Sequence, residues 1–331
     1  MKTIAFFNNK GGVGKTSLVY HLSWMFARLG KRVLSADLDP QANLTSMYLD
    51  DEALLNLWDS DTKHSIYDAL RPLIEGTGDI DAPSVERVSE GLGLLAGDLA
   101  LSRFEDQLSE NWPKCLSGDV RAFRVISAFY RLLYRGATSM DAEFVFIDVG
   151  PNLGAINRAA LIAADYVVVP LGADLFSIQG LRNLGPSLIS WRGEWEKRMR
   201  ELPADSLKGE PMPKGTMKPI GYVLLQHGAR ENRPVQAYEN WAVKIPKTYR
   251  EYLLKETSTT SGPSHGGTDP NNLGMLKHYR SLMPMAMAAH KPMFYLKPAD
   301  GAIGAHVEAV KNCLEDFKAL AHRILKEVAD A

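Results

Sequence analysis

The 331-residue sequence predicts an α/β fold, a doubly wound and mostly parallel sheet with helices on both faces. Short apolar runs of the buried-strand type alternate with longer stretches in which apolar residues recur every three or four positions. A glycine cluster joins the first run to the first helix, and aspartates follow two of the later runs. Strands that alternate with helices form parallel sheets, and helices cover both faces of such sheets.

The predicted elements follow one another from the first residues onward. Residues 3–8 (TIAFFN) predict a buried strand, and residues 15–29 predict a helix whose apolar positions 18, 22, 25 and 29 form one stripe. Gly30, directly after this stripe, is a typical helix terminator. Residues 32–36 form the second strand, which ends in an acidic turn. Later strands are expected at 144–147, 166–171 and 220–225, and later helices at 120–134 and 153–164.

We expect a single domain over residues 1–331, because the sequence contains no internal repeat and no clear second apolar core. Two segments are predicted to be surface insertions. Residues 203–219 contain several prolines and lysines. Residues 257–274 are rich in Ser, Thr, Gly, Pro and Asn and almost free of apolar side chains, which predicts a loop.

The overall composition is that of an ordinary globular protein, and its charge, cysteine content and apolar runs restrict the kinds of partner that it can bind. A formal net charge of −1 means that nucleic acid could be bound only by a local basic patch. Cys115 and Cys313 lie far apart without a partner at metal-ligand spacing, so we expect two free thiols. The start does not resemble a signal peptide, and no apolar run is long enough to span a membrane. We therefore expect a cytoplasmic protein.

A glycine-rich segment between the first strand and the first helix predicts a phosphate-binding site. Its sequence, KGGVGKTS over residues 10–17, has glycines where the backbone must turn with its N–H groups directed toward phosphate oxygens. The phosphates would also meet the positive N-terminus of the following helix. Lys15 would reach the outer phosphates, and the Thr16 hydroxyl would join a Mg²⁺ shell. The expected nucleotide contacts are Gly11, Gly12, Val13, Gly14, Lys15, Thr16 and Ser17.

Acidic residues follow two of the predicted strands. The turn after the second strand has the sequence DLDPQ, and alternation places Asp37 and Asp39 on the same side of an extended chain. The strand at 144–147 is followed by Asp148, from where a carboxylate can hold Mg²⁺ through water. We expect these carboxylates near the phosphates, because ligands bind beyond the carboxyl ends of parallel strands.

Together these motifs resemble those of the ParA/MinD family of deviant Walker ATPases, P-loop NTPases with an extra lysine near the start of the phosphate loop. Lys10 occupies that position. The resemblance implies that Lys10 reaches across a dimer interface to the partner's nucleotide, where a cation offsets charge that develops in phosphoryl transfer. The resemblance also implies that the nucleotide is ATP and that Lys10, Lys15 and Asp39 are catalytic residues. In this family the residue at the position of Asp39 orients the attacking water. The resemblance assigns Mg²⁺ to Thr16, Asp37 and Asp148.

The resemblance extends over nearly the whole chain but is looser in the C-terminal half. Residues 65–70, 92–97 and 168–181 match further segments of the family. Gln226, at the end of its strand, falls where relatives contact adenine. Asp148 corresponds to the aspartate that ends the family's Walker B strand. Most relatives have Pro-Pro shortly after it, whereas this chain has Gly150 and Pro151. This difference does not affect the expected metal role of Asp148, but it does not predict the conformation of the following loop.

The family contains several functional classes, and the sequence argues against two of them. Electron-transfer members bridge their dimer with a cysteine-bound cluster, but Cys115 and Cys313 lie away from the matching motifs. Membrane-bound members have a basic amphipathic helix at the C-terminus. Apolar positions between 307 and 328 predict an amphipathic helix here, yet its polar face mixes acidic and basic residues. We expect this helix to pack on the domain.

DNA-binding members contact DNA through scattered basic residues. Candidate residues form two patches, Arg192, Lys197, Arg198 and Arg200 in the first and Lys244, Lys247, Arg250 and Lys255 in the second. Aromatic residues accompany both patches: Trp191, Trp195, Trp241, Tyr249 and Tyr252. Glutamates interrupt both, so a solvated helix face is an equally simple interpretation.

The resemblance favours a ParA-like ATPase for DNA segregation or cargo positioning. ATP would drive a sandwich homodimer that binds DNA without sequence preference and is therefore associated with the nucleoid. A ParB-like or cargo adaptor protein would stimulate slow hydrolysis and so release the dimer. Two alternatives stay open: a nucleotide-dependent switch whose output is a protein partner without DNA, and a MinD-like membrane-associated ATPase, although no membrane partner is expected.

Overall fold

The computed structural model describes residues 1–59, 64–207, 209–225, 241–256 and 269–330. Its strands are β1 (Lys2–Phe6), β2 (Val33–Asp37), β3 (Glu86–Ser89), β4 (Leu92–Leu95), β5 (Phe144–Asp148), β6 (Tyr166–Leu171), β7 (Lys218–Leu225) and β8 (Asn272–Leu276). They form one eight-stranded sheet in the order β3-β4-β2-β5-β1-β6-β7-β8. Neighbouring strands are parallel except β3 and β4.

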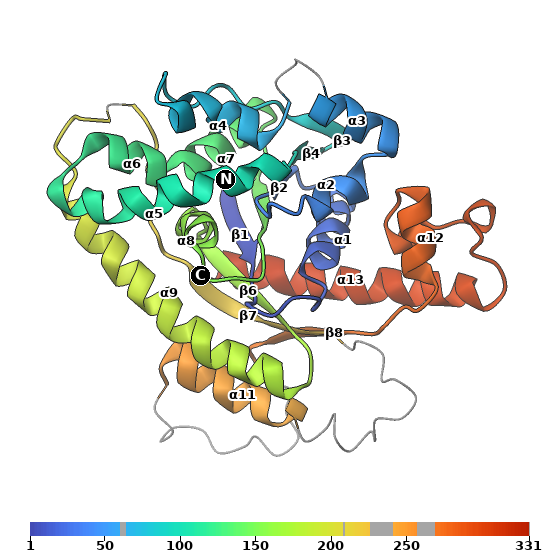
Figure 1. The fold of residues 1–331 in the computed structure, drawn as a ribbon. Coiled ribbons are helices and arrows are strands. Elements are labelled where there is room, and N and C mark those ends of the chain that lie inside the picture. The colour runs from blue at the N-terminus through green and yellow to red at the C-terminus, as the bar shows by residue number, and fades with distance from the viewer. Residues whose placement is uncertain (60–63, 208, 226–240, 257–268, 331) are drawn as a thin grey trace.

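Helices cover both faces of this sheet, as Figure 1 shows. One face carries α1 (Lys15–Arg28), α2 (Asn43–Tyr48), α3 (Asp51–Asp59), α12 (Leu282–Ala289) and α13 (Ala305–Ala329). The other carries α4 (Ile66–Glu75), α5 (Phe104–Lys114), α6 (Val120–Ile126), α7 (Ala128–Ser139), α8 (Ala155–Ile162), α9 (Leu175–Glu201) and α11 (Lys244–Tyr249). The predicted doubly wound, mostly parallel α/β fold is confirmed.

The central strands are apolar throughout because they are buried on both faces. Ile4 and Phe6 of β1 lie in the core on the α1 side, whereas Ala5 and the adjoining Phe7 lie in the core on the other side. All four side chains are fully buried. Successive side chains of a strand point to opposite faces, so a strand between two helical layers needs an uninterrupted apolar run. Burying one such phenylalanine contributes about 1.5–3 kcal/mol.

The prediction of one continuous helix over residues 120–134 is wrong, because Ser127 separates two helices, α6 and α7. The Ser127 hydroxyl donates a hydrogen bond of 2.7 Å to the carbonyl oxygen of Phe123. A serine that bonds the carbonyl four residues earlier competes with the regular backbone pattern and bends the helix. The chain therefore turns between two shorter helices at this residue.

The predicted loop over residues 257–274 extends too far, because its last three residues belong to β8, which begins at Asn272. Leu273 and Leu276 of this strand are buried against α13, which supplies the apolar contacts that a loop would lack. Gly221 in β7 permits the pairing: its φ is 146°, and a Cβ there would lie 2.6 Å from Leu273 Cγ. Residues 257–268 lie outside the described residues.

Two further segments pack against the domain, the first more firmly than its composition suggests. Met217, within the 203–219 segment, is fully buried, and the Pro213 carbonyl oxygen accepts a hydrogen bond of 2.9 Å from the buried Trp195 indole of α9. The C-terminal amphipathic helix, α13, packs on the domain as expected, with Phe317 and Ile324 buried. None of the helices in the described ranges is long and apolar enough to cross a membrane.

Candidate nucleotide-binding site

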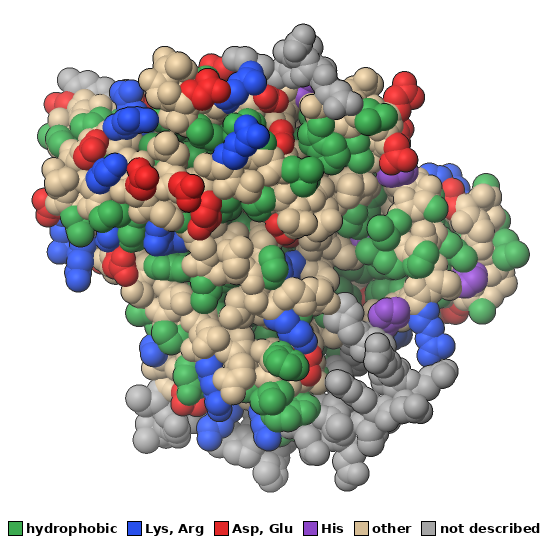
Figure 2. Space-filling model, in the orientation of Figure 1, with side chains coloured by type: hydrophobic (Ala, Val, Ile, Leu, Met, Phe, Trp, Pro, Cys, Tyr) green, Lys and Arg blue, Asp and Glu red, His purple; other side chains and the backbone are tan. Residues whose placement is uncertain are grey.

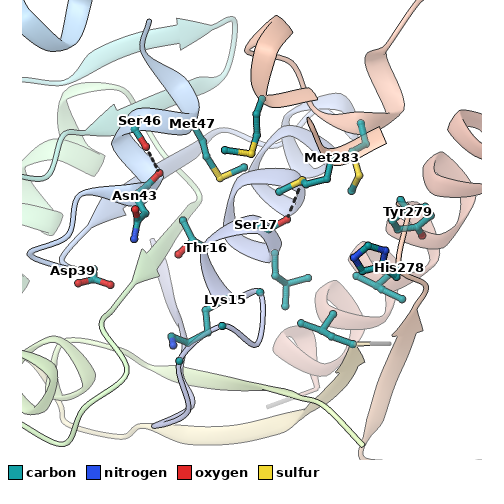
Figure 3. Close-up of a pocket in the computed structure, with 18 of the residues that line it drawn as sticks. Lys15, Thr16, Ser17, Asp39, Asn43, Ser46, Met47, His278, Tyr279 and Met283 are labelled. Carbon is teal, nitrogen blue, oxygen red and sulfur yellow. Dashed lines mark hydrogen bonds between the residues drawn. The ribbon is translucent and has the colours of Figure 1, made fainter. Parts of the chain in front are cut away.

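A cavity of about 560 Å³ opens beside the phosphate loop. Its lining combines the glycine-rich loop and the start of α1 with residues 39–47 and the segment that follows β8 (Figure 3). The Ser17 hydroxyl contacts the Met283 sulfur at 3.8 Å, so α12 lies directly against the first turn of α1. The cavity thus has a polar half at the loop and a methionine-rich half at α12, a combination that suits a phosphorylated molecule with an apolar ring.

The glycine-rich loop has the backbone that phosphate binding requires. Gly12 and Gly14 adopt φ values of 70° and 83°, which only glycine adopts without strain. Gly14 precedes α1, and no described side chain caps this helix, so its first N–H groups face the cavity uncapped. The Val13 side chain is buried and does not line the cavity. A phosphate placed there would meet backbone donors and the helix dipole together.

Lys15 is almost completely buried at the floor of this loop. Its ammonium donates a hydrogen bond of 3.3 Å to the Lys10 carbonyl oxygen. Burial lowers the pKa of Lys15, and the nearby Asp148 and Asp39 carboxylates oppose that change. Lys15 and Thr16 point toward the side of the cavity where Asp39 lies (Figure 3). A desolvated cation in this position can pair strongly with a phosphate.

Asp37 and Asp148 form a buried carboxylate pair behind the cavity. They are register partners on β2 and β5, and both side chains are fully buried. Among the described residues, the oxygens of Asp148 have no hydrogen bond of ordinary geometry, although the Thr16 hydroxyl lies close enough to affect the carboxyl group. Burial raises the pKa of Asp37 to about 7. Burial and the Asp37 charge raise the pKa of Asp148 well above its ordinary value, and the Thr16 hydroxyl and the Lys15 charge oppose this only in part.

The unpartnered carboxylate oxygens fit a divalent cation. A buried charge without partners is costly, and a bound cation removes that cost. In the described ranges no three His, Cys, Asp or Glu side chains converge as a complete ligand set. Magnesium does not need one, because it keeps several waters and binds through one or two carboxylates plus phosphates. Thr16, Asp37 and Asp148 are the residues that would hold it.

Asp39 lies on the cavity wall, largely buried, in the turn between β2 and α2. Its Oδ1 atom accepts a hydrogen bond of 3.1 Å from the Gln41 backbone N–H. A Cβ added to Gly150 would lie 3.3 Å from this oxygen. The loop after β5 therefore approaches Asp39 closely, and the absence of a side chain at Gly150 suits this packing.

Lys10 begins the phosphate loop, and its ammonium is held by a side chain of the same protein chain. Its ammonium forms an ion pair with Asp174, the residue that caps α9, and lies 5.7 Å from the centre of the Phe176 ring. Burial tends to raise the pKa of Asp174, but hydrogen bonds from Lys10 and Ser177 hold it below the ordinary value. The Lys10 ammonium therefore contacts Asp174, whereas the Lys10 carbonyl oxygen accepts the hydrogen bond from Lys15.

The structure adds residues that the sequence patterns did not indicate. Thr45 binds the Asp37 carboxylate through both its backbone N–H and its hydroxyl. Asp174 could have been recognised only as a helix cap, from its spacing to Ser177, and not as the partner of Lys10. Gln226, the expected adenine contact, lies outside the described residues.

The first candidate DNA patch is largely structural. The Arg198 guanidinium is buried, lies 3.9 Å from the centre of the Trp112 ring and donates to the Trp112 carbonyl oxygen. Arg192 donates to the carbonyl oxygens of Thr216 and Met217. Trp191 and Trp195, which accompany this patch, are buried. Stacking of nucleic-acid bases on these indoles is therefore sterically blocked, and of the four cations in this patch Lys197 and Arg200 stay exposed.

The second patch keeps exposed cations. Lys244 and Lys247 of α11 are exposed, as is Lys255, whereas Arg250 lies 3.7 Å from Asp269. The Lys244 ammonium lies 4.5 Å from the centre of the Trp241 ring. Figure 2 shows Lys and Arg side chains at the lower end of the molecule, over α9 and α11. This surface, defined by Lys244 and Lys247 and called here the α11 patch, has the sign of charge that attracts a phosphate backbone.

Comparison with known proteins places this site in a family. A family model described as an AAA domain matches residues 1–198. The chain is 28% identical over 266 residues to the sporulation initiation inhibitor protein Soj of Bacillus subtilis, covering 80% of this chain and 88% of Soj. It is 29% identical over 199 residues to the chromosome partitioning protein ParA of Caulobacter vibrioides, covering 60% of this chain and 66% of that protein.

A solved structure agrees with the sequence relatives. Protein DIP2308 from Corynebacterium diphtheriae superimposes with a TM-score of 0.69 at 29% identity, covering 88% of this chain and 97% of that chain. The match therefore includes the C-terminal half, beyond the residues that the family model covers. Together with the phosphate loop, the buried acidic pair and the doubly wound sheet, these likenesses show that the chain belongs to the ParA/MinD family of deviant Walker P-loop ATPases.

Proposed function

We propose that this protein is a ParA-like switch that binds ATP with Mg²⁺, forms an ATP-sandwich homodimer, and binds DNA in that state. An adaptor protein of the ParB-like or cargo type stimulates slow hydrolysis and releases the dimer. One observation carries the proposal: two fully buried carboxylates, Asp37 and Asp148, are register partners next to the phosphate loop, and among the described residues the oxygens of Asp148 have no hydrogen bond of ordinary geometry. The extra lysine, Lys10, begins that loop.

Each proposed catalytic role follows from a side chain's surroundings. Lys15 and the uncapped N-terminus of α1 bind the phosphates. Thr16, Asp37 and Asp148 hold Mg²⁺, which neutralises negative charge on the phosphate oxygens. Asp39, which lines the same cavity, orients the attacking water. The methionine-rich half of the cavity takes the base, with Gln226 proposed as a further adenine contact.

Exposed apolar side chains beside Lys10 support dimerisation. Leu175 and Phe176 are 45% and 69% exposed. Leu175 and Phe176 begin α9, next to the ion pair between Lys10 and Asp174. Large apolar side chains that gather at a functional edge are typical of a surface that a partner covers. A second copy docked there would bring its own Lys10 toward this nucleotide, once that lysine had left Asp174.

Replacing Lys10 with alanine should weaken the ATP dimer about a hundredfold or more, because the symmetric homodimer loses two hydrogen bonds between charged groups across the interface. ATP binding by the monomer should be retained, since Lys15 still contacts the phosphates. Sedimentation velocity with ATP and Mg²⁺ measures the dimer. Lys31→Ala is the matched control, because Lys31 pairs with Glu143 on the surface at 3.1 Å. Unchanged dimerisation and turnover in Lys10→Ala would remove this residue from the site.

DNA retention is the test of the proposed output. With a slowly hydrolysed ATP analogue, the protein should bind random-sequence duplex DNA, and binding should weaken steeply as salt rises. Without nucleotide or with ADP it should elute freely. Lys244→Ala combined with Lys247→Ala should lower affinity and flatten the salt dependence. The matched control is Lys197→Ala with Arg200→Ala, which removes two charges from exposed positions of the first patch.

The other outcomes of that experiment decide between the alternatives. Retention of the ATP-bound protein on vesicles of anionic phospholipid, but not on DNA, would favour a MinD-like ATPase. Retention on neither surface, in a protein that still dimerises with ATP, would contradict DNA binding and favour a switch that acts on a protein partner.

A further inference from the structure

We infer that Thr45 is a positioning residue for the metal site: its hydroxyl fixes the Asp37 carboxylate so that one oxygen, Oδ1, stays available to the water shell of the cation. This inference rests on the proposed ATP and Mg²⁺ site and extends it to a residue that contacts neither the nucleotide nor the metal. Thr45 lies in the first turn of α2, eight residues after Asp37, and is fully buried.

The hydrogen bonds of Thr45 join three elements of the fold. Its backbone N–H and its hydroxyl each donate to Asp37 Oδ2 at 2.8 Å. The hydroxyl oxygen in turn accepts a hydrogen bond of 2.8 Å from the Gly97 N–H, just after β4. The hydroxyl therefore uses both its donor and its acceptor capacity in a dry environment, which locks its rotation.

This arrangement distinguishes the two oxygens of Asp37. Oδ2 is saturated by two short hydrogen bonds, whereas within the described part of the chain Oδ1 accepts only from the Asp39 N–H, at 3.3 Å. A Cβ added to Gly97 would lie 2.9 Å from Asp37 Cγ, so the carboxylate is also confined sterically. Because Oδ2 is saturated and the Asp37 carboxylate cannot rotate freely, Oδ1 is the atom of this side chain that can accept a further ligand. Outer contacts of this kind commonly orient metal-binding groups.

A structural role alone would give different behaviour. Asp37 also caps α2, since it accepts the Thr45 N–H, and that bond does not depend on the threonine side chain. Thr45→Val removes the hydroxyl, keeps the branched shape and keeps the backbone N–H. Thr45→Ser restores the hydroxyl without the methyl group. The two variants therefore separate the hydrogen bond to Asp37 from packing and from the helix cap.

The experiment follows thermal unfolding of the full chain with ATP while Mg²⁺ is added, and repeats ATP binding in EDTA. We expect Thr45→Val to need about tenfold more Mg²⁺ for half of the stabilisation, and Thr45→Ser to resemble wild type. ATP binding in EDTA should be the same in all three proteins, because the phosphate loop is untouched. Equal Mg²⁺ requirements in Thr45→Val and wild type, or equal losses in the Val and Ser variants, would overturn the inference.

A second variant pair tests whether Thr45 acts through Asp37. In the Asp37→Asn background, Thr45→Val should have no additional effect on the Mg²⁺ requirement, since residues that act as one unit are not additive. Additive effects would overturn the inference, as would a parallel loss of ATP binding in EDTA. A wild-type protein that binds ATP without any response to Mg²⁺ would instead contradict the proposed metal site itself, and the inference with it.

Discussion

Lys15→Ala is expected to abolish measurable ATP binding, with a loss of at least about a hundredfold in affinity. The lysine is desolvated, and removing one member of a buried charge pair costs about 3–5 kcal/mol. Without its ammonium, the triphosphate would also face the Asp39 and Asp148 carboxylates, which lie close enough to perturb the pKa of Lys15. Isothermal titration calorimetry with ATP and Mg²⁺ measures the loss directly.

Two controls define what the Lys15 result means. Circular dichroism of the variant should match wild type, because the loop backbone is set by Gly12 and Gly14 and not by the lysine side chain. Lys15→Arg should not restore wild-type affinity, since a planar guanidinium is larger than the ammonium and does not fit a site buried to this extent. ATP affinity equal to wild type in a folded Lys15→Ala protein would move the nucleotide site elsewhere in the molecule.

Asp39→Ala should lower ATP turnover by about a hundredfold or more, because a group that orients or activates the attacking water contributes roughly 10²–10⁴ in rate. ATP binding should persist, so the protein should accumulate as a long-lived ATP dimer. Phosphate release reports turnover, and size-exclusion chromatography with ATP reports the dimer. The dimer should disappear if Lys10→Ala is added to this variant.

Asp39→Asn is the matched control for this prediction. Asparagine keeps the size of the side chain and an oxygen that can accept the Gln41 N–H, a bond of 3.1 Å in the native turn. If turnover is lost with both alanine and asparagine, the carboxylate itself is required. Wild-type turnover in Asp39→Asn would assign only a structural role to this residue and place the water-orienting group elsewhere.

Local sequence patterns predicted much of the fold because they reflect local physics. β6 occupies residues 166–171 as the apolar run predicted, and α1 begins at Lys15 directly after the glycine cluster. A strand buried on both faces needs an apolar run, and a phosphate loop needs glycines at fixed offsets. The edge strand β8 was missed because Asn272 and Gly274 resemble a loop, and its stability comes from α13 and β7 rather than from its own composition.

The basic patches illustrate the limit of such patterns. The two patches resemble each other in sequence, with cations, aromatic residues and glutamates interleaved. In the fold, Arg198 is buried against Trp112, a residue 86 positions away, whereas Lys244 stays exposed beside Trp241. Exposure depends on what packs against a helix, and distant segments of the chain determine that packing.

The sequence by itself therefore determined the chemistry of the site, because the phosphate loop and the acidic turns are contiguous motifs at the ends of strands. The tertiary structure decided how that chemistry is held. It pairs Lys10 with Asp174 and links Asp37 through Thr45 to Gly97, contacts that join residues 164 and 52 positions apart. Such pairings exist only after the sheet has brought the strand ends together, so no local pattern carries them.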